Sequence, residues 1–76
     1  MRFGTNWSDE TQALTREHLG LYARPGGPPL PMKAWDGRFG LLVADNGTFR
    51  ISDRESGSVE TYASVAALIG SGWAID

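Results

Sequence analysis

The sequence contains no cysteine and only one histidine, which removes two common kinds of functional site. Without cysteine there is no disulfide, no thiolate nucleophile and no thiolate metal ligand. His18 alone cannot build a zinc site from imidazole and thiolate ligands. No cofactor motif is present either, so we expect neither a metal nor a cofactor.

Long apolar runs and an excess of basic residues are also missing. No stretch approaches the roughly 18 apolar residues of a membrane span. The first residues, 1–5, lack the basic-then-apolar pattern of a signal peptide, so we expect a cytoplasmic protein without membrane contact. Seven Lys and Arg against nine Asp and Glu give a net charge of −2, which argues against a nucleic-acid partner.

The chain has 76 residues, which suffices for one domain with one small core. A domain of this size buries only about 60% of the surface that its unfolded chain exposes. No disulfide or zinc site adds stability here. A protein partner, or a second copy of the chain in a homodimer, would supply further burial.

Residues 8–19 predict a helix. Ser8 is a suitable N-cap, Asp9 and Glu10 place negative charge in the first turn, and Gly20 is a suitable stop. One face of this helix should carry the residues that recur at helical spacing, which are Trp7, Thr11, Leu14, His18 and Leu21.

Residues 24–37 predict a connector that is neither helix nor central strand, because four prolines restrict φ and remove backbone donors. Within it, residues 28–31 also match the short proline-rich type that aromatic grooves bind in a polyproline II conformation. A structural connector is the preferred interpretation of the two.

Residues 38–76 predict a β-β-β-α-β unit, and its clearest signal is a hairpin turn at Asn46-Gly47. A type I′ turn needs positive φ at both central positions, which Asn-Gly tolerates. Closing there pairs Asp45 with Thr48 and Leu42 with Ile51. The core face of the hairpin would then carry Leu42, Ala44, Phe49 and Ile51.

A second turn at residues 55–57 predicts the third strand of an antiparallel meander. The preferred register opposes Val59 to Asp53 and Thr61 to Ile51, which places Val59 and Thr61 on the core face. A shift by one residue would bring Glu60 into the core, and the hydrophobic pattern disfavours it.

The remaining residues predict a short helix over 63–69 and a short strand at the C-terminal end. The ten-residue crossover between strands is just long enough to return the last strand parallel to its neighbour. The fold class is therefore α+β, in the order α-β-β-β-α-β, as one domain over residues 1–76. We expect a buried core of Leu42, Phe49, Ile51, Val65, Leu68 and Trp73.

The second face of the predicted sheet is the candidate partner-binding site. Its apolar and anchoring residues are Phe39, Leu41, Val43, Arg50, Glu60 and Tyr62. A solvated face would be polar throughout, so three outward apolar positions on one strand need a cover. Either the N-terminal helix or the proline loop packs there, or a partner does.

Catalysis has one candidate, His18 with Glu10 and Glu17 nearby in sequence. A histidine titrates near neutral pH and a carboxylate can orient it, but nothing marks a particular serine as an activated nucleophile. We therefore expect no catalytic residue, and we keep a small toxin-like nuclease that uses His18 as an alternative.

The leading hypothesis is a non-catalytic protein-binding or inhibitory module that acts by surface complementarity. In size and composition the chain is similar to phage or mobile-element inhibitors, anti-CRISPR proteins among them, and no specific motif carries this resemblance. A structural subunit of a larger complex, or a homodimer, is the third possibility.

Overall fold

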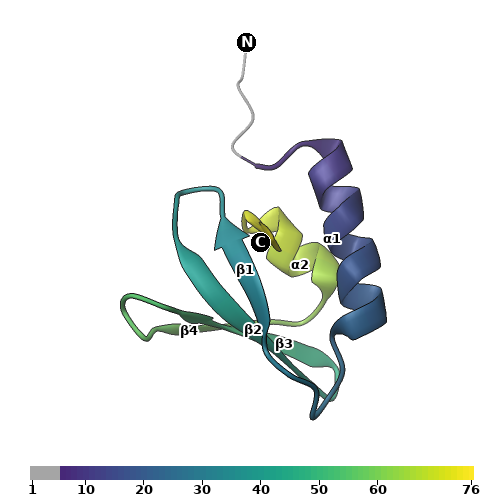
Figure 1. Ribbon diagram of the computed structural model, residues 1–76, viewed down its shortest axis with the longest axis vertical. Coiled ribbons are helices and arrows are strands. Elements are labelled where there is room, and N and C mark those ends of the chain that lie inside the picture. The colour runs from purple at the N-terminus through teal and green to yellow at the C-terminus, as the bar shows by residue number, and fades with distance from the viewer. Residues whose placement is uncertain (1–5) are drawn as a thin grey trace.

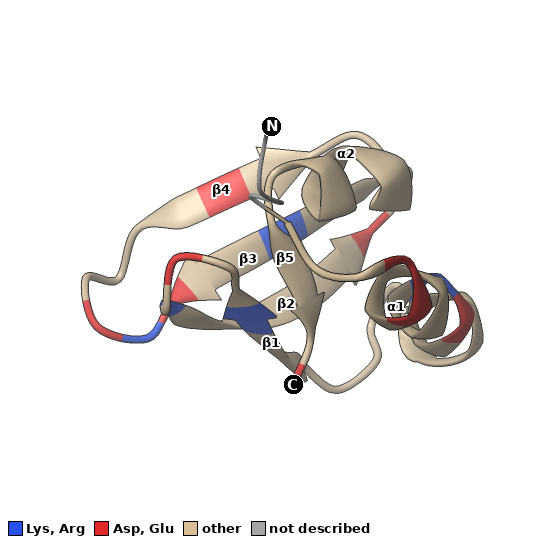
Figure 2. Ribbon diagram, turned by 90° about the horizontal axis from the view of Figure 1, so that it is seen from above, with Lys and Arg blue, Asp and Glu red and all other residues tan. Residues whose placement is uncertain are grey.

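The computed structural model describes residues 6–76, which form a five-stranded antiparallel sheet and two helices (Figure 1). The elements are α1 (Asp9–Tyr22), β1 (Leu30–Ala34), β2 (Phe39–Asp45), β3 (Thr48–Asp53), β4 (Val59–Tyr62), α2 (Val65–Gly70) and β5 (Trp73–Ile75). Both helices pack on the same face of the sheet (Figure 2), where Leu19 of α1 and Leu68 of α2 join one buried cluster. The expected α+β order, with a β-meander followed by a short helix and a last strand, is confirmed.

The predicted connector over 24–37 was wrong in one respect, because it contains the inner strand β1. The strand order is β4-β3-β2-β1-β5, so β1 pairs with both β2 and β5. Pro31 is tolerated because its carbonyl accepts from the backbone N–H of Asp76, at the end of β5. The Pro31 nitrogen also points towards β5, so the backbone N–H that proline lacks would lie at the end of the β1–β5 hydrogen-bond ladder.

The last strand also differs from expectation, since β5 runs antiparallel to β1 and not parallel to a neighbour. The partner that β5 requires is the strand hidden in the proline segment. The C-terminal strand therefore returns beside β1, across the sheet from β4.

The β2–β3 hairpin has the predicted register, with Leu42 opposite Ile51 and Asp45 opposite Thr48. Its turn type was wrong. Gly47 has φ +82°, whereas no residue other than glycine has positive φ in the described part of the chain, Asn46 included. This combination fits a type II turn better than type I′.

The β3–β4 register is one residue away from the prediction, with Ile51 opposite Glu60 and Ser52 opposite Val59. The loop closes by a hydrogen bond of 2.8 Å from the Asp53 N–H to the Ser58 carbonyl. Val59 and Thr61 consequently leave the core face, and Glu60 enters it. The expectation that a carboxylate would be excluded from this face was wrong.

Helix α1 begins where predicted, since the Ser8 side chain accepts from the Thr11 N–H, but it runs on through Gly20 to Tyr22. Its buried face was also mispredicted, because Thr15 and Leu19 are the residues that are buried. The Thr15 hydroxyl accepts from the Ile75 N–H at 3.3 Å and donates to the Thr11 carbonyl at 2.8 Å. Thr15 thereby covers part of the free edge of β5.

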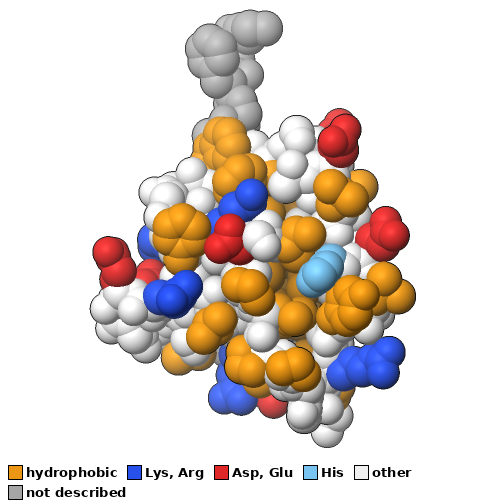
Figure 3. All heavy atoms as spheres, viewed as in Figure 1, with side chains coloured by type: hydrophobic (Ala, Val, Ile, Leu, Met, Phe, Trp, Pro, Cys, Tyr) orange, Lys and Arg blue, Asp and Glu red, His pale blue; other side chains and the backbone are white. Residues whose placement is uncertain are grey.

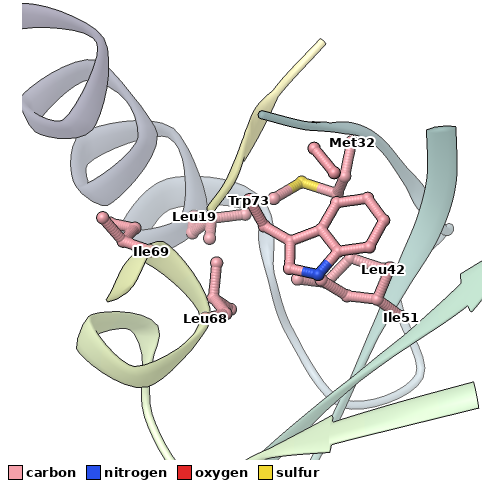
Figure 4. Close-up of a cluster of buried hydrophobic side chains, with 8 residues drawn as sticks. Leu19, Met32, Leu42, Ile51, Leu68, Ile69 and Trp73 are labelled. Atoms are coloured by element: carbon pink, nitrogen blue, oxygen red, sulfur yellow. The ribbon is translucent and has the colours of Figure 1, made fainter. Parts of the chain in front are cut away.

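The core is built around Trp73, whose indole lies between the sheet and the helices (Figure 4). Leu42, Ile51, Leu68 and Trp73 are buried as predicted, while Phe49 and Val65 are only partly buried at the margin of the cluster. The predicted core omitted the rest of the buried cluster, which is Leu19, Met32, Ala34 and Ile69.

Gly40 is the position at which the sheet makes room for Trp73. A Cβ at Gly40 would lie 2.7 Å from Cγ2 of Ile51, 2.8 Å from the Ser52 carbonyl oxygen and 3.3 Å from the far edge of the Trp73 indole. No side chain fits there without displacing the core. Glycine is therefore required at position 40 because neighbouring atoms leave no room for a side chain. Its backbone conformation does not require glycine, since its φ is not positive.

We predict that Gly40→Ala lowers the free energy of unfolding by about 2–3 kcal/mol through overpacking. The matched control is Gly20→Ala, which adds a methyl in open space on α1 and should raise it by about 0.5–1 kcal/mol. Urea unfolding followed by circular dichroism measures both. Equal effects of the two substitutions would contradict the packing of Trp73 over Gly40.

Candidate functional site

The face of the sheet that points away from the helices is rich in exposed hydrophobic side chains. Phe39, Leu41 and Val59 are 50%, 37% and 56% exposed, respectively. Val43 is half-buried, and Arg50 is exposed beside it. We call this surface the open face and define it by Pro31, Lys33, Phe39, Leu41, Val43, Arg50, Val59 and Thr61.

The register of four strands makes the middle of the open face continuous. Leu41 lies opposite Pro31 on one side and opposite Ser52 on the other, and Ser52 lies opposite Val59. Cross-strand partners project from the same face, so these residues form one band across the sheet. The band is apolar except at Ser52.

An ion pair borders the band at one end of β2. The Arg50 guanidinium, opposite Val43 on the neighbouring strand, lies 2.7 Å from a carboxylate oxygen of Asp45. Both partners are about half exposed, so the pair is screened and contributes little to folding stability. Both groups remain accessible to a partner.

A tryptophan pair borders the open face at the other end. The Lys33 amine lies 4.8 Å from the centroid of the Trp7 ring, and Trp7 packs edge-on against Trp35 with a centroid distance of 5.0 Å. The Trp7 indole donates to the Gly72 carbonyl at 2.8 Å, which fixes its position. The segment before α1 thus contacts one end of the sheet, while α1 itself packs on the other face.

Two residues predicted for the partner-binding surface, Glu60 and Tyr62, lie on the helix-facing side instead. The Tyr62 hydroxyl donates to the Glu60 carboxylate, and the Trp73 indole N–H donates to both, at 3.2 Å to Glu60 and 3.1 Å to Tyr62. Arg38 donates to the other oxygen of Glu60 at 3.0 Å. Neither residue can serve as an anchor on the open face.

These contacts shift the protonation equilibria of the cluster. The Tyr62 hydroxyl and, next, the Arg38 guanidinium hold the pKa of Glu60 below its ordinary value, against the opposing effect of burial. Burial, and next the adjacent Glu60 carboxylate, raise the pKa of Tyr62. Glu60 therefore stays charged and paired at the margin of the core.

His18, the catalytic candidate of the sequence, is half-buried on α1. Its ring packs against Tyr22 at a centroid distance of 4.7 Å. No group of three or more His, Cys, Asp or Glu side chains within residues 6–76 is placed to hold a metal ion. The proline-rich segment 28–31 is not a free peptide that an aromatic groove could bind, because Leu30 and Pro31 are paired within β1.

The sequence identified four residues of the open face and missed four. Phe39, Leu41, Val43 and Arg50 lie where they were expected. Pro31 and Lys33 were missed because the strand that carries them was taken for a connector. Val59 and Thr61 were missed because the third strand was placed one residue out of register.

Comparison of the chain with protein-family models, with curated proteins and with solved structures found no match. Within the part of the chain that the structure describes, no helix is both long and apolar enough to cross a membrane.

The Glu60 cluster predicts a defined pH dependence of stability. Because the pKa of Glu60 is lower in the folded protein than in the unfolded chain, its stabilising contribution is present above the unfolded pKa and is lost as the pH falls through the folded one. We predict that Glu60→Gln destabilises the protein at pH 7, and that its difference from wild type shrinks towards pH 3.

Thermal unfolding at a series of pH values measures this difference. The control is Glu55→Gln in the exposed β3–β4 loop, which should follow the wild-type curve. A difference between wild type and Glu60→Gln that stays constant with pH would contradict the role assigned to the carboxylate.

Proposed function

We propose that this protein is a non-catalytic binding module that recognises another protein through its open face. The observation that carries the proposal is the band of side chains across β1–β4, which is apolar except at Ser52 and is bordered by Arg50 and Lys33. Exposed apolar patches with polar rims mark interaction sites on small soluble domains. Neither helix covers this band, because α1 and α2 pack on the opposite face through Leu19, Leu68 and Ile69.

The chemistry of the band indicates how a partner would bind. Phe39 and Leu41 supply an apolar floor, and Arg50 supplies a guanidinium that can exchange Asp45 for a carboxylate of the partner. Aromatic and arginine side chains are enriched among the residues that dominate binding energy. We therefore place the anchors at Phe39, Leu41 and Arg50, and we exclude Tyr62, which the sequence had placed on the same surface.

An inhibitory role is one form of this proposal. A small domain that covers a functional surface of its partner blocks the activity of that surface, and it needs no catalytic group to do so. The similarity in size and composition to phage or mobile-element inhibitors supports this form.

The test is loss of binding without loss of folding. Affinity capture from a lysate, read by mass spectrometry, identifies the partner, and calorimetry with the purified partner then gives the affinity. We predict that Leu41→Asp weakens binding at least about thirtyfold, equivalent to about 2 kcal/mol, while thermal stability changes little.

The matched control is Ala66→Asp on α2, which introduces the same charge at an exposed position on the helical side of the molecule. This variant should bind as wild type does. Normal binding by a folded Leu41→Asp protein would refute the open face as the binding site. Loss of biological activity in His18→Ala, with binding retained, would favour the nuclease alternative.

A further inference from the structure

Helix α1 carries a second apolar stripe that the fold does not use. Leu14, Leu21 and Tyr22 are 51%, 53% and 55% exposed, and His18 lies between them against the Tyr22 ring. Figure 3 shows hydrophobic side chains gathered around the single histidine on this side of the molecule. We call Leu14, His18, Leu21 and Tyr22 the outer stripe of α1.

The spacing of the outer stripe is that of a helix-pairing seam. The steps from Leu14 to His18 and from His18 to Leu21 are four and three residues, which is the a/d repeat of a coiled coil. The inner residues Thr15 and Leu19 already pack against β5 and α2. One side of α1 thus serves the core, and the adjacent side has the pattern of a contact with another helix.

The surface beside the stripe is hollowed. A depression of about 240 Å³ is lined by Leu14, Glu17, His18, Leu21, Tyr22 and Ile75. A second, of about 350 Å³, lies between the end of α1 and the proline-rich loop, and it shares Leu21 and Tyr22 with the first. Protruding leucines flanked by depressions are the knobs and holes that a paired helix requires.

Charge indicates which helix fits the seam. Glu10 lies in the first turn of α1 and Arg24 lies just beyond its last turn, and neither has an ion-pair partner within residues 6–76. The midpoint between residues 10 and 24 in the sequence is position 17. The midpoint between Leu14 and Leu21 lies between positions 17 and 18. A two-fold axis near Glu17 would bring Glu10 beside Arg24 of a second copy and Leu14 beside Leu21 at the same time.

An antiparallel arrangement is the one that these charges favour. It also opposes the two helix dipoles, so that each acidic first turn lies beside the other helix's C-terminal end and its arginine. A parallel arrangement would place Glu10 against Glu10 and Arg24 against Arg24, which is repulsive. The two Glu17 side chains meet in either arrangement, so they do not distinguish the two. A two-fold contact of this kind is closed and self-complementary.

We infer that the chain forms a homodimer in which the outer stripes of two α1 helices pack antiparallel about a two-fold axis near Glu17. The contact uses no residue of the open face, so each dimer presents two open faces and could bind a repeated partner with avidity. The inference is independent of the proposed function, since the dimer can be present or absent whichever surface binds the partner.

Sedimentation equilibrium of the purified chain tests the inference, over about 5–500 µM, a range that reports dissociation constants in the micromolar range. We expect a dimer mass that falls on dilution. Leu21→Glu should raise the dissociation constant at least about a hundredfold, because each lost leucine contact costs about tenfold and occurs twice. The control is Leu41→Glu on the open face, which should leave the dimer intact, and circular dichroism verifies the fold of each variant.

Charge exchange tests the antiparallel arrangement itself. Arg24→Glu should weaken the dimer, and the double variant Glu10→Arg, Arg24→Glu should restore it by reversing both pairs. A wild-type monomer at 500 µM, or a dimer that Leu21→Glu leaves unchanged, would overturn the proposed interface. A double variant no tighter than Arg24→Glu alone would overturn the antiparallel pairing.

Discussion

The packing of Trp73 against Gly40 is the constraint on which the rest of the structure depends. The indole is only 1% exposed, and the absent side chain at Gly40 lets it lie directly on β2. Because Trp73 belongs to β5, this contact requires β5 to lie on the β1 side of the sheet. The pairing of β5 with the proline-containing strand follows, and so does the position of α1, whose Thr15 hydroxyl accepts from the β5 backbone.

Trp73 also explains the polar cluster at the margin of the core. Its indole N–H needs an acceptor when the ring is buried, and the Glu60 carboxylate and Tyr62 hydroxyl provide it. The Glu60 carboxylate on this face needs a cation in turn, and Arg38 pairs with it. The Arg38 guanidinium also lies 5.2 Å from the centroid of the Trp73 ring. The helix-facing side of the sheet is therefore occupied by groups that satisfy one another, whereas Phe39, Leu41 and Val59 on the opposite side remain exposed.

Local patterns in the sequence predicted much of the fold, and contacts between distant residues decided the remainder. The β2–β3 register followed from a single dipeptide, Asn46-Gly47, because turn length sets the pairing. The β3–β4 register failed because Glu60 was expected to avoid the core, and its partner Arg38 lies 22 residues away. No local signal connects these two positions.

The same distinction explains what could be predicted of the candidate site. The alternation of Phe39, Leu41 and Val43 identified the open face correctly, since the side-chain period of a strand is visible in the sequence. The strand β1 was missed because of Pro31. The energetic cost of its missing backbone N–H depends on where the neighbouring strand β5 ends, and only the folded sheet determines that. The inner face of α1 was missed because Thr15 is buried for its hydrogen bond to β5, whereas the more hydrophobic Leu14 and Leu21 stay exposed.

The packing of Trp73 on Gly40 is tested most directly by the nuclear Overhauser contacts of the Trp73 ring. The structure predicts a strong contact between the outer edge of the indole and the α-protons of Gly40, together with one between the indole N–H and the Tyr62 ring. Indole contacts with Leu41 or Phe39 instead would mean that β2 presents its other face to the core. The open face, and the function proposed for it, would then be wrong.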